Sequence, residues 1–260
     1  MELRTPNSLV LIPGIQGRWE YMRPTVDALS RHFDVRPLSL RDGAQSLDDL
    51  VQQVSDVLDE GRVERAVICG VSFGGLVAIR FAARYPERVA ALVLASVPQS
   101  LMTLRRRHRL YARFPWILGP LFLVETPWRL RRELAAALPS FGARTAFKWR
   151  AVRTSFVAPI SLRQMATRAR LMSTTDVRPD CARVTSPTLI VTGEAHLDWV
   201  VPVHSSIEYA RLISGARATI LERTGHTGTM TRPDAFADLV DDFAERETRS
   251  PKRGTPDAAA

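Results

Sequence analysis

Cysteine is scarce in this sequence, with Cys69 and Cys181 the only two among 260 residues. Two cysteines cannot form a disulfide framework, so the core has to stabilise the fold, and a reducing compartment is expected. Long apolar runs are missing as well, because none approaches the roughly 18 residues that a membrane span requires. The apolar run at residues 9–12 is too short for a secretory signal. We therefore expect a cytoplasmic protein without a membrane span.

Lysine is also rare, since Lys148 and Lys252 are the two lysines among 36 basic residues. The formal net charge of +9 therefore comes from arginine, and it is unevenly distributed. Residues 100–183 contain 17 basic and four acidic residues, whereas the rest of the chain has a slight acidic excess. This concentration predicts an anionic partner or substrate for the segment. Nucleic acid is not the expected partner, because no recognisable nucleic-acid-binding module is present.

Strand-like and helix-like patterns alternate outside the basic segment. Before it, apolar β-favouring runs lie at residues 8–12, 33–38, 66–69 and 89–95, with helical patterns at 24–31, 46–60 and 74–84. After it, strands are predicted at 188–192 and 218–221, and helices at 203–213 and 233–244. Strict alternation predicts an α/β fold with a mostly parallel sheet flanked by helices.

The alternation is interrupted by a helical, aromatic and arginine-rich stretch, which is broken by Pro115, Pro120, Pro127, Pro139 and Pro159. We predict that residues 98–183 form a helical cap inserted into one α/β core, which comprises residues 1–97 and 184–245. Residues 246–260 contain no core-forming pattern and are expected to form a disordered tail.

A serine lies at the turn between the strand 66–69 and the helix that follows it. The segment Gly70-Val71-Ser72-Phe73-Gly74 has the pattern G-x-S-x-G, in which small residues permit a strained backbone at a nucleophilic serine. A glycine-rich turn with Ser72 as an ordinary helix cap is the alternative. A nucleotide-binding loop is not indicated, because the segment matches neither glycine-rich phosphate motif.

A nucleophilic serine needs a base and an acid to orient that base. The C-terminal part of the chain supplies candidates for both, and with Ser72 they follow the chain order serine, acid, histidine that this motif requires. His226 follows the strand 218–221 and is the favoured base, with His196 as a rival. Asp198 follows the strand 188–192 and is the favoured acid, with Glu194 as the alternative. The histidines and cysteines lack the spacing of metal ligands, so neither a metal nor a cofactor is expected.

Residues 8–245 resemble a serine-dependent α/β-hydrolase with a helical cap. The resemblance implies an α/β-hydrolase fold with the cap inserted after the sixth strand, and an oxyanion hole formed by the backbone N–H groups of Ile15 and Phe73. This chain departs from the family in having Pro13 where a histidine commonly precedes Gly14. It also has a longer spacing from Gly193 to Asp198, which keeps Glu194 open as the acid.

The resemblance implies hydrolysis of a carboxylic ester or thioester through an acyl-enzyme on Ser72. Carbon–carbon bond hydrolysis, perhydrolysis or lyase chemistry at the same triad remain alternatives, as does a non-catalytic ligand-binding role. A small acyl ester is the expected substrate, and Trp116, Phe122 and Trp128 are candidates for its pocket or for packing of the cap. The basic cap is a candidate docking surface for an acidic carrier protein, although such arginine runs are also typical of solvated helix faces.

Overall fold

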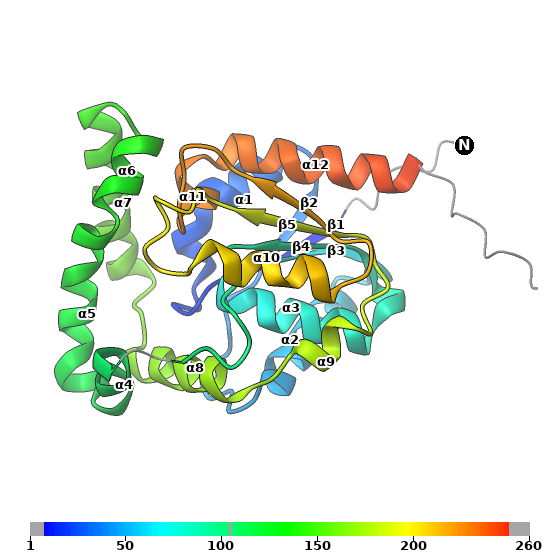
Figure 1. Ribbon diagram of the computed structural model, residues 1–260, viewed down its shortest axis with the longest axis horizontal. Helices are drawn as coiled ribbons and strands as arrows, with labels where there is room; N and C mark the ends of the chain where they lie inside the picture. The colour runs from blue at the N-terminus through cyan, green and yellow to red at the C-terminus, as the bar shows by residue number, and fades with distance from the viewer. Residues whose placement is uncertain (1–7, 104–105, 250–260) are drawn as a thin grey trace, which may run out of the picture.

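The computed structural model describes residues 8–103 and 106–249, apart from some side chains in helices α4, α5 and α12. Its centre is a six-stranded sheet in the order β2-β1-β3-β4-β5-β6 (Figure 1). All neighbouring strands pair in parallel. The strands are β1 (Ser8–Ile12), β2 (Asp34–Pro37), β3 (Ala66–Val71), β4 (Val89–Ala95), β5 (Thr188–Thr192) and β6 (Arg217–Ile220). The predicted parallel α/β sheet is confirmed.

Helices cover both faces of the sheet, and each face has its own apolar cluster. One face is covered by α2 (Leu47–Glu60), α3 (Phe73–Arg84), α9 (Arg178–Cys181) and α10 (Val203–Leu212). The other is covered by α1 (Arg23–Leu29), α11 (Gly228–Thr231) and α12 (Pro233–Arg249). Two 3₁₀ turns, Trp19–Met22 and Pro86–Arg88, lead into α1 and β4.

The local sequence explains where these elements begin and how deeply they are buried. All six residues of β3 are buried, as expected for a strand that is covered by helices on both faces. Helix α2 begins at a capping box, in which the Ser46 side chain accepts from Asp49 N and the Asp49 carboxylate accepts from Ser46 N.

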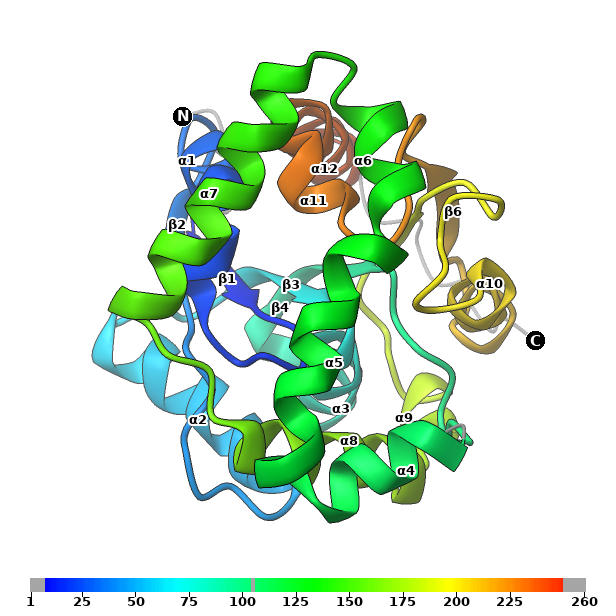
Figure 2. The same cartoon turned by 90° about the vertical axis from the view of Figure 1, so that its left-hand side faces the viewer.

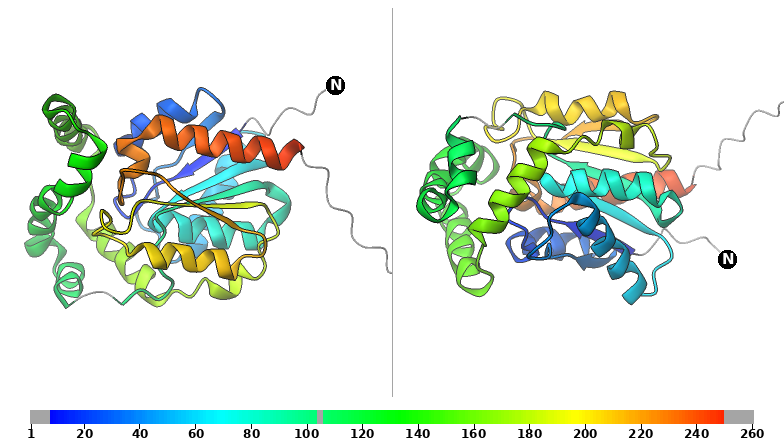
Figure 3. Two further views of the ribbon diagram at one scale, coloured as in Figure 1. Left: turned by 45° about the horizontal axis from the view of Figure 1, so that its top comes forward. Right: turned by 90° about the horizontal axis from the view of Figure 1, so that it is seen from below.

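Among the described residues, five helices form the cap. They lie across the carboxyl ends of the strands (Figures 2 and 3). They are α4 (Arg106–Arg113), α5 (Pro115–Arg129), α6 (Arg131–Ala137), α7 (Phe141–Val157) and α8 (Leu162–Thr174). The cap follows β4, which is the fourth strand of the described chain, and not a sixth strand as expected. The reason is that only four segments between residues 8 and 97 form strands.

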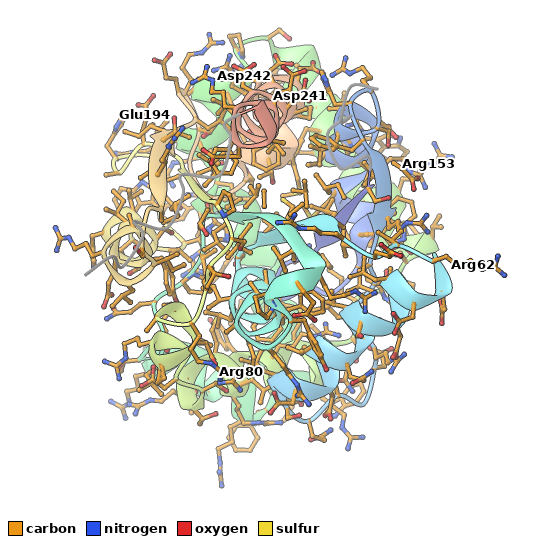
Figure 4. The ribbon with its side chains drawn as sticks, turned by 90° about the vertical axis from the view of Figure 1, so that its right-hand side faces the viewer. Arg62, Arg80, Arg153, Glu194, Asp241 and Asp242 are labelled. Carbon is orange, nitrogen blue, oxygen red and sulfur yellow. The ribbon has the colours of Figure 1, made fainter. Side chains whose placement is uncertain are left out.

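Two predicted domain boundaries differ from the structure. Helix α9 belongs to the core, because Cys181 is buried in the cluster beneath α3 and Arg80 donates to Asp180 with an Nε–Oδ2 distance of 2.9 Å (Figure 4). Helix α12 continues to Arg249, beyond the tail boundary at residue 246. Near this end of the helix, Arg246 forms an ion pair with Asp242 one turn before it. Residues 250–260 lie outside the described part of the chain.

Candidate active site

Ser72 lies in a sharp turn between β3 and α3, at the edge of the sheet beneath the cap. Its backbone has φ 53° and ψ −122°, a conformation that L-residues rarely adopt. Its own N–H donates to Ala95 O of the neighbouring strand at 2.8 Å, which fixes the turn to the sheet. The strained turn has the backbone geometry that the G-x-S-x-G motif predicts at this position.

The two glycines of the motif are required by close backbone contacts. A Cβ on Gly74 would lie 2.4 Å from Ile12 O, and a Cβ on Gly70 would lie 2.5 Å from Gly74 O. Both distances are too short for any side chain. The glycines therefore let helix α3 approach the end of β1 closely, and this approach brings Ser72 next to the loop that follows β1.

One candidate oxyanion donor directly follows Ser72 in the chain, and the other lies in the turn after β1. Phe73 is the first residue of α3, so its N–H has no partner within the helix. Ile15 lies in the turn after β1, where Gly17 N donates to Gly14 O at 2.9 Å, and it lines the same cavity as Ser72. Pro13 does not prevent this arrangement, since the candidate donors are backbone groups.

Arg168 of cap helix α8 contacts the same turn after β1. Its guanidinium donates to Ile15 O and to Leu40 O, each at 3.2 Å, and its side chain is only 4% exposed. Burial lowers the pKa of Arg168 to about 10, which still leaves it charged at neutral pH. The cap therefore contributes a buried cation that orders the turn carrying Ile15. No pattern in the sequence marks this residue.

His226 lies between Ser72 and Asp198. Its Nε2 is 3.2 Å from Ser72 Oγ, and its Nδ1 is 3.5 Å from Asp198 Oδ2. The second distance is long for a hydrogen bond, as is common in catalytic sites without substrate. Asp198 is held in place because its Oδ1 accepts from the N–H groups of Val200 and Val201, both at 2.9 Å. The structure thus brings together the three side chains that the sequence singles out.

The electrostatic surroundings of His226 favour its charged form. Burial by itself lowers the pKa of His226, but the adjacent carboxylate of Asp198 and the charge of Glu133 outweigh burial and hold this pKa above its usual value. A histidine that gains a proton readily next to a serine hydroxyl has the property required of a general base.

The alternative acid and the alternative base lie elsewhere. Glu194 lies near strand β6 (Figure 4), where one carboxylate oxygen accepts from Arg223 N at 2.6 Å and the other is 3.5 Å from His196. The His196 side chain is 73% exposed. Neither residue contacts Ser72 or His226 among the contacts of the described residues. The geometry therefore favours Asp198 and His226.

A cavity of about 480 Å³ lies between the cap and the sheet edge, and Ser72 and His226 form part of its wall. Its remaining wall is mainly apolar. Helix α8 provides Leu162, Met165, Ala166, Ala169 and Met172, the segment after β4 provides Leu101 and Met102, and the loop after β5 provides Trp199, Val200 and Val201.

The aromatic residues that the sequence suggested for this pocket do not line it. Trp116 and Trp128 are 75% and 69% exposed and are absent from the cavity wall. The physical reason is that both lie on the outward side of α5, which contributes Pro115 and Arg129 to the cavity instead. The Phe122 side chain lies outside the described part of the structure.

The thiols do not compete with Ser72 as nucleophiles. Cys69 and Cys181 are both free and buried, and burial raises the pKa of each to about 12. Within the described residues, no group of three or more His, Cys, Asp and Glu side chains is placed to hold a metal ion. Within the same residues, no helix is long and apolar enough to cross a membrane.

Comparison with known proteins identifies the family. The sequence profile of the alpha/beta hydrolase fold matches residues 7–233, and the chain belongs to this family. Pimeloyl-(acyl-carrier protein) methyl ester esterase of Nitrosomonas europaea is 27% identical over 231 residues, covering 83% of this chain and 87% of the relative.

Two further comparisons agree with this family assignment. 2-Hydroxy-6-oxo-2,4-heptadienoate hydrolase of Pseudomonas putida is 27% identical over 262 residues, covering 93% of this chain and 90% of the relative. The solved structure of the enol-lactonase from Burkholderia xenovorans has the same fold, with a TM-score of 0.76 and 23% identity, covering 92% of this chain and 91% of that one. The protein is a hydrolase of the α/β-hydrolase family.

Proposed function

We propose that the protein is a serine hydrolase that cleaves carboxylic esters or thioesters through an acyl-enzyme on Ser72. The observation that carries this proposal is the 3.2 Å distance between His226 Nε2 and Ser72 Oγ, at a strained turn beside an apolar cavity. The named esterase among its relatives supports the reaction class. The two buried free thiols suit a reducing compartment, and we propose the cytoplasm.

The proposed reaction has two halves. The Ser72 hydroxyl proton passes to His226 Nε2 while Oγ bonds to the acyl carbon, and the carbonyl electron pair moves onto oxygen. The backbone N–H groups of Ile15 and Phe73 donate to that oxyanion. When the electron pair returns, the bond to the alcohol or thiol breaks and the leaving group takes the proton from His226. Water then attacks the acyl-enzyme, again with His226 as the base, and releases the acid.

The apolar cavity predicts a preference for acyl groups of medium length. Each methylene that enters it should raise kcat/KM roughly fourfold, the equivalent of about 0.8 kcal/mol per buried methylene, until the cavity is full. Hydrolysis of p-nitrophenyl esters from acetate to palmitate measures this dependence. We expect a maximum between butanoate and octanoate. A flat dependence would contradict the assignment of this cavity as the acyl site.

Carbon–carbon bond hydrolysis is the second candidate function. Two observations favour it: a relative named for hydrolysis of a 2-hydroxy-6-oxo dienoate, and the position of Arg129 in the cavity wall, where a cation suits an acidic substrate. A protein that is labelled at Ser72 by a fluorophosphonate, yet turns over none of the esters, would favour this candidate over the esterase.

We also propose that the basic cap binds an acidic carrier protein that presents the acyl group. The support is a relative named for an ester on acyl-carrier protein, together with a cap surface rich in exposed basic side chains. Arg107 also lies in α4, but its side chain lies outside the described residues. The exposed basic residues described in the cap are Arg106, Arg109, Arg113, Arg131, Arg132, Lys148, Arg150, Arg153, Arg163 and Arg170.

Charge reversal on α4 tests the carrier proposal. The double variant Arg106→Glu with Arg109→Glu should raise KM for a carrier-linked ester about tenfold, because rim charges govern encounter, and leave the p-nitrophenyl esters unaffected. The control is Arg62→Glu, an exposed arginine outside the cap (Figure 4). If the double variant had the same KM as the native protein and the Arg62→Glu control for the carrier-linked ester, the carrier proposal would be contradicted.

A further inference from the structure

A carboxylate of the cap is buried against the histidine loop. Glu133 lies on α6 and is only 1% exposed. Its Oε1 accepts from both Thr227 N at 2.6 Å and Thr227 Oγ1 at 2.7 Å, and Thr227 directly follows His226. Its Oε2 is buried without a hydrogen-bond partner among the described residues. Two short hydrogen bonds to one carboxylate oxygen therefore connect the cap to the backbone and side chain of Thr227, next to the candidate base.

The other side of this loop is fixed by the core. A Cβ on Gly225 would lie 2.6 Å from Leu197 O, so the histidine loop and the loop carrying Asp198 pack backbone against backbone. Glu194 N donates to Thr224 O at 2.8 Å and joins the same two loops. His226 thus lies between a contact with the core before it and a contact with Glu133 after it.

A buried carboxylate in this position has an energetic cost. Burial raises the pKa of Glu133, while the bonds from Thr227 and the charge of His226 oppose that rise. The charged groups facing His226 are Asp198 from the loop after β5 and Glu133 from α6, and Arg129 and His204 line the same cavity. An apolar side chain would close this cap-to-core contact without desolvating a charge. A contribution of the carboxylate to the position and charge of His226 would account for this cost.

We propose that Glu133 is a positioning residue for His226: its carboxylate fixes the Gly225–Thr227 loop from the cap and places a second negative charge beside the imidazole. This inference rests on the proposed Ser72–His226 chemistry and extends it. It makes correct placement of the cap a condition for correct alignment of the base.

Two substitutions separate the bonds of Glu133 from its charge. Glu133→Gln keeps an oxygen for the Thr227 bonds and removes the charge, whereas Glu133→Ala removes both. In Glu133→Ala we expect kcat to fall about 100-fold with KM little changed, because a misplaced catalytic group costs about that much. In Glu133→Gln the acid limb of the pH profile should move to lower pH, because a charge that stabilises the imidazolium is lost. Glu125→Gln, another charge removal in the cap, should leave that limb in place.

The rate of fluorophosphonate labelling distinguishes positioning from simple loosening of the cap. A positioning role predicts that labelling of Ser72 slows in step with kcat in Glu133→Ala, since the small probe needs an aligned base but no closed cap. An open cap alone would raise KM and leave labelling unchanged or faster. Unchanged labelling in Glu133→Ala, or an unmoved acid limb in Glu133→Gln, would overturn the inference.

A measurement that needs no turnover keeps this test separate from the proposed function. NMR titration of the His226 imidazole should give a lower pKa in Glu133→Gln than in the unchanged protein, even if Ser72 proves not to be the nucleophile. If the unchanged protein is neither labelled nor active, the proposed function fails. The titration alone then shows whether the charge of Glu133 raises the pKa of His226. An identical His226 titration in both proteins would overturn the inference.

Discussion

Substituting Ser72 with alanine should lower kcat by about 10⁶-fold for every substrate that the native protein hydrolyses, the scale of loss for the nucleophile of a serine hydrolase. The reason is that the reaction then has no oxygen that can form the acyl-enzyme. The fold should survive, because alanine occupies less space than serine and the Ser72 N–H bond to Ala95 belongs to the backbone. Initial rates with a p-nitrophenyl ester and thermal unfolding measure the two effects separately.

Ser96 provides a matched control for this substitution. Like Ser72, it directly follows a central strand and has a positive φ, 48° compared with 53° at Ser72. Its backbone N–H donates to the adjacent strand, at Val191 O, as that of Ser72 donates to Ala95 O. Ser96→Ala should retain near-native turnover. If Ser72→Ala hydrolysed the ester at the native rate while Ser96→Ala was impaired, Ser72 would not be the nucleophile.

Substituting Asp198 with asparagine should lower kcat by about 10⁴-fold, because an amide in place of the carboxylate no longer selects the correct histidine tautomer or stabilises the imidazolium. The substitution keeps the shape of the side chain and an oxygen that can accept from Val200 and Val201. The pH profile should change with it. The carboxylate raises the pKa of His226, and a base is active only when unprotonated, so activity is lost as pH falls through that raised pKa. In Asp198→Asn this acid limb should therefore move to lower pH.

Glu194→Gln is the control that decides between the two candidate acids. Glu194 binds Arg223 N and lies near His196. We therefore expect kcat within about threefold of native and an unmoved acid limb, as for a substitution that leaves the active site unchanged. A large loss in Glu194→Gln together with a small loss in Asp198→Asn would reverse the assignment of the acid.

The nucleophile turn could be predicted because its requirements are local. A buried strand, two small residues around Ser72 and a helix start are adjacent in the chain, and Gly70 and Gly74 mark where the backbone passes closely. The histidine could be predicted with less local support, since His226 follows a strand whose carboxyl end must reach the same sheet edge as Ser72. Its distance from Ser72 becomes visible only in the folded chain.

The residues of the cavity wall could not be predicted, because they depend on which side of each cap helix faces the sheet. The prominent aromatic residues Trp116 and Trp128 lie on the outside, whereas the wall is formed by less conspicuous side chains such as Met165 and Met172. Met is common in core helices, so its presence in α8 gives no signal of a pocket. Pattern alone does not determine which apolar side of a cap helix faces the sheet.

Glu133 and Arg168 were missed for a different reason. Each is a charged residue within a segment full of charges, and charged residues in helices are usually exposed. Their partners are distant in sequence: Thr227 for Glu133, and Ile15 for Arg168. The one available signal was the scarcity of acidic residues in the basic segment, which made Glu133 unusual there. Scarcity marks a residue as exceptional without indicating what it contacts.

Identification of the covalently modified residue tests the central claim most directly. The native protein would be treated with a fluorophosphonate, its intact mass measured, and the modified peptide sequenced by mass spectrometry. We predict one label per chain, located on Ser72 and absent from both Ser72→Ala and His226→Ala after the same exposure. A label on another residue, or no label on the folded native protein, would contradict the proposal that Ser72 is a nucleophile activated by His226.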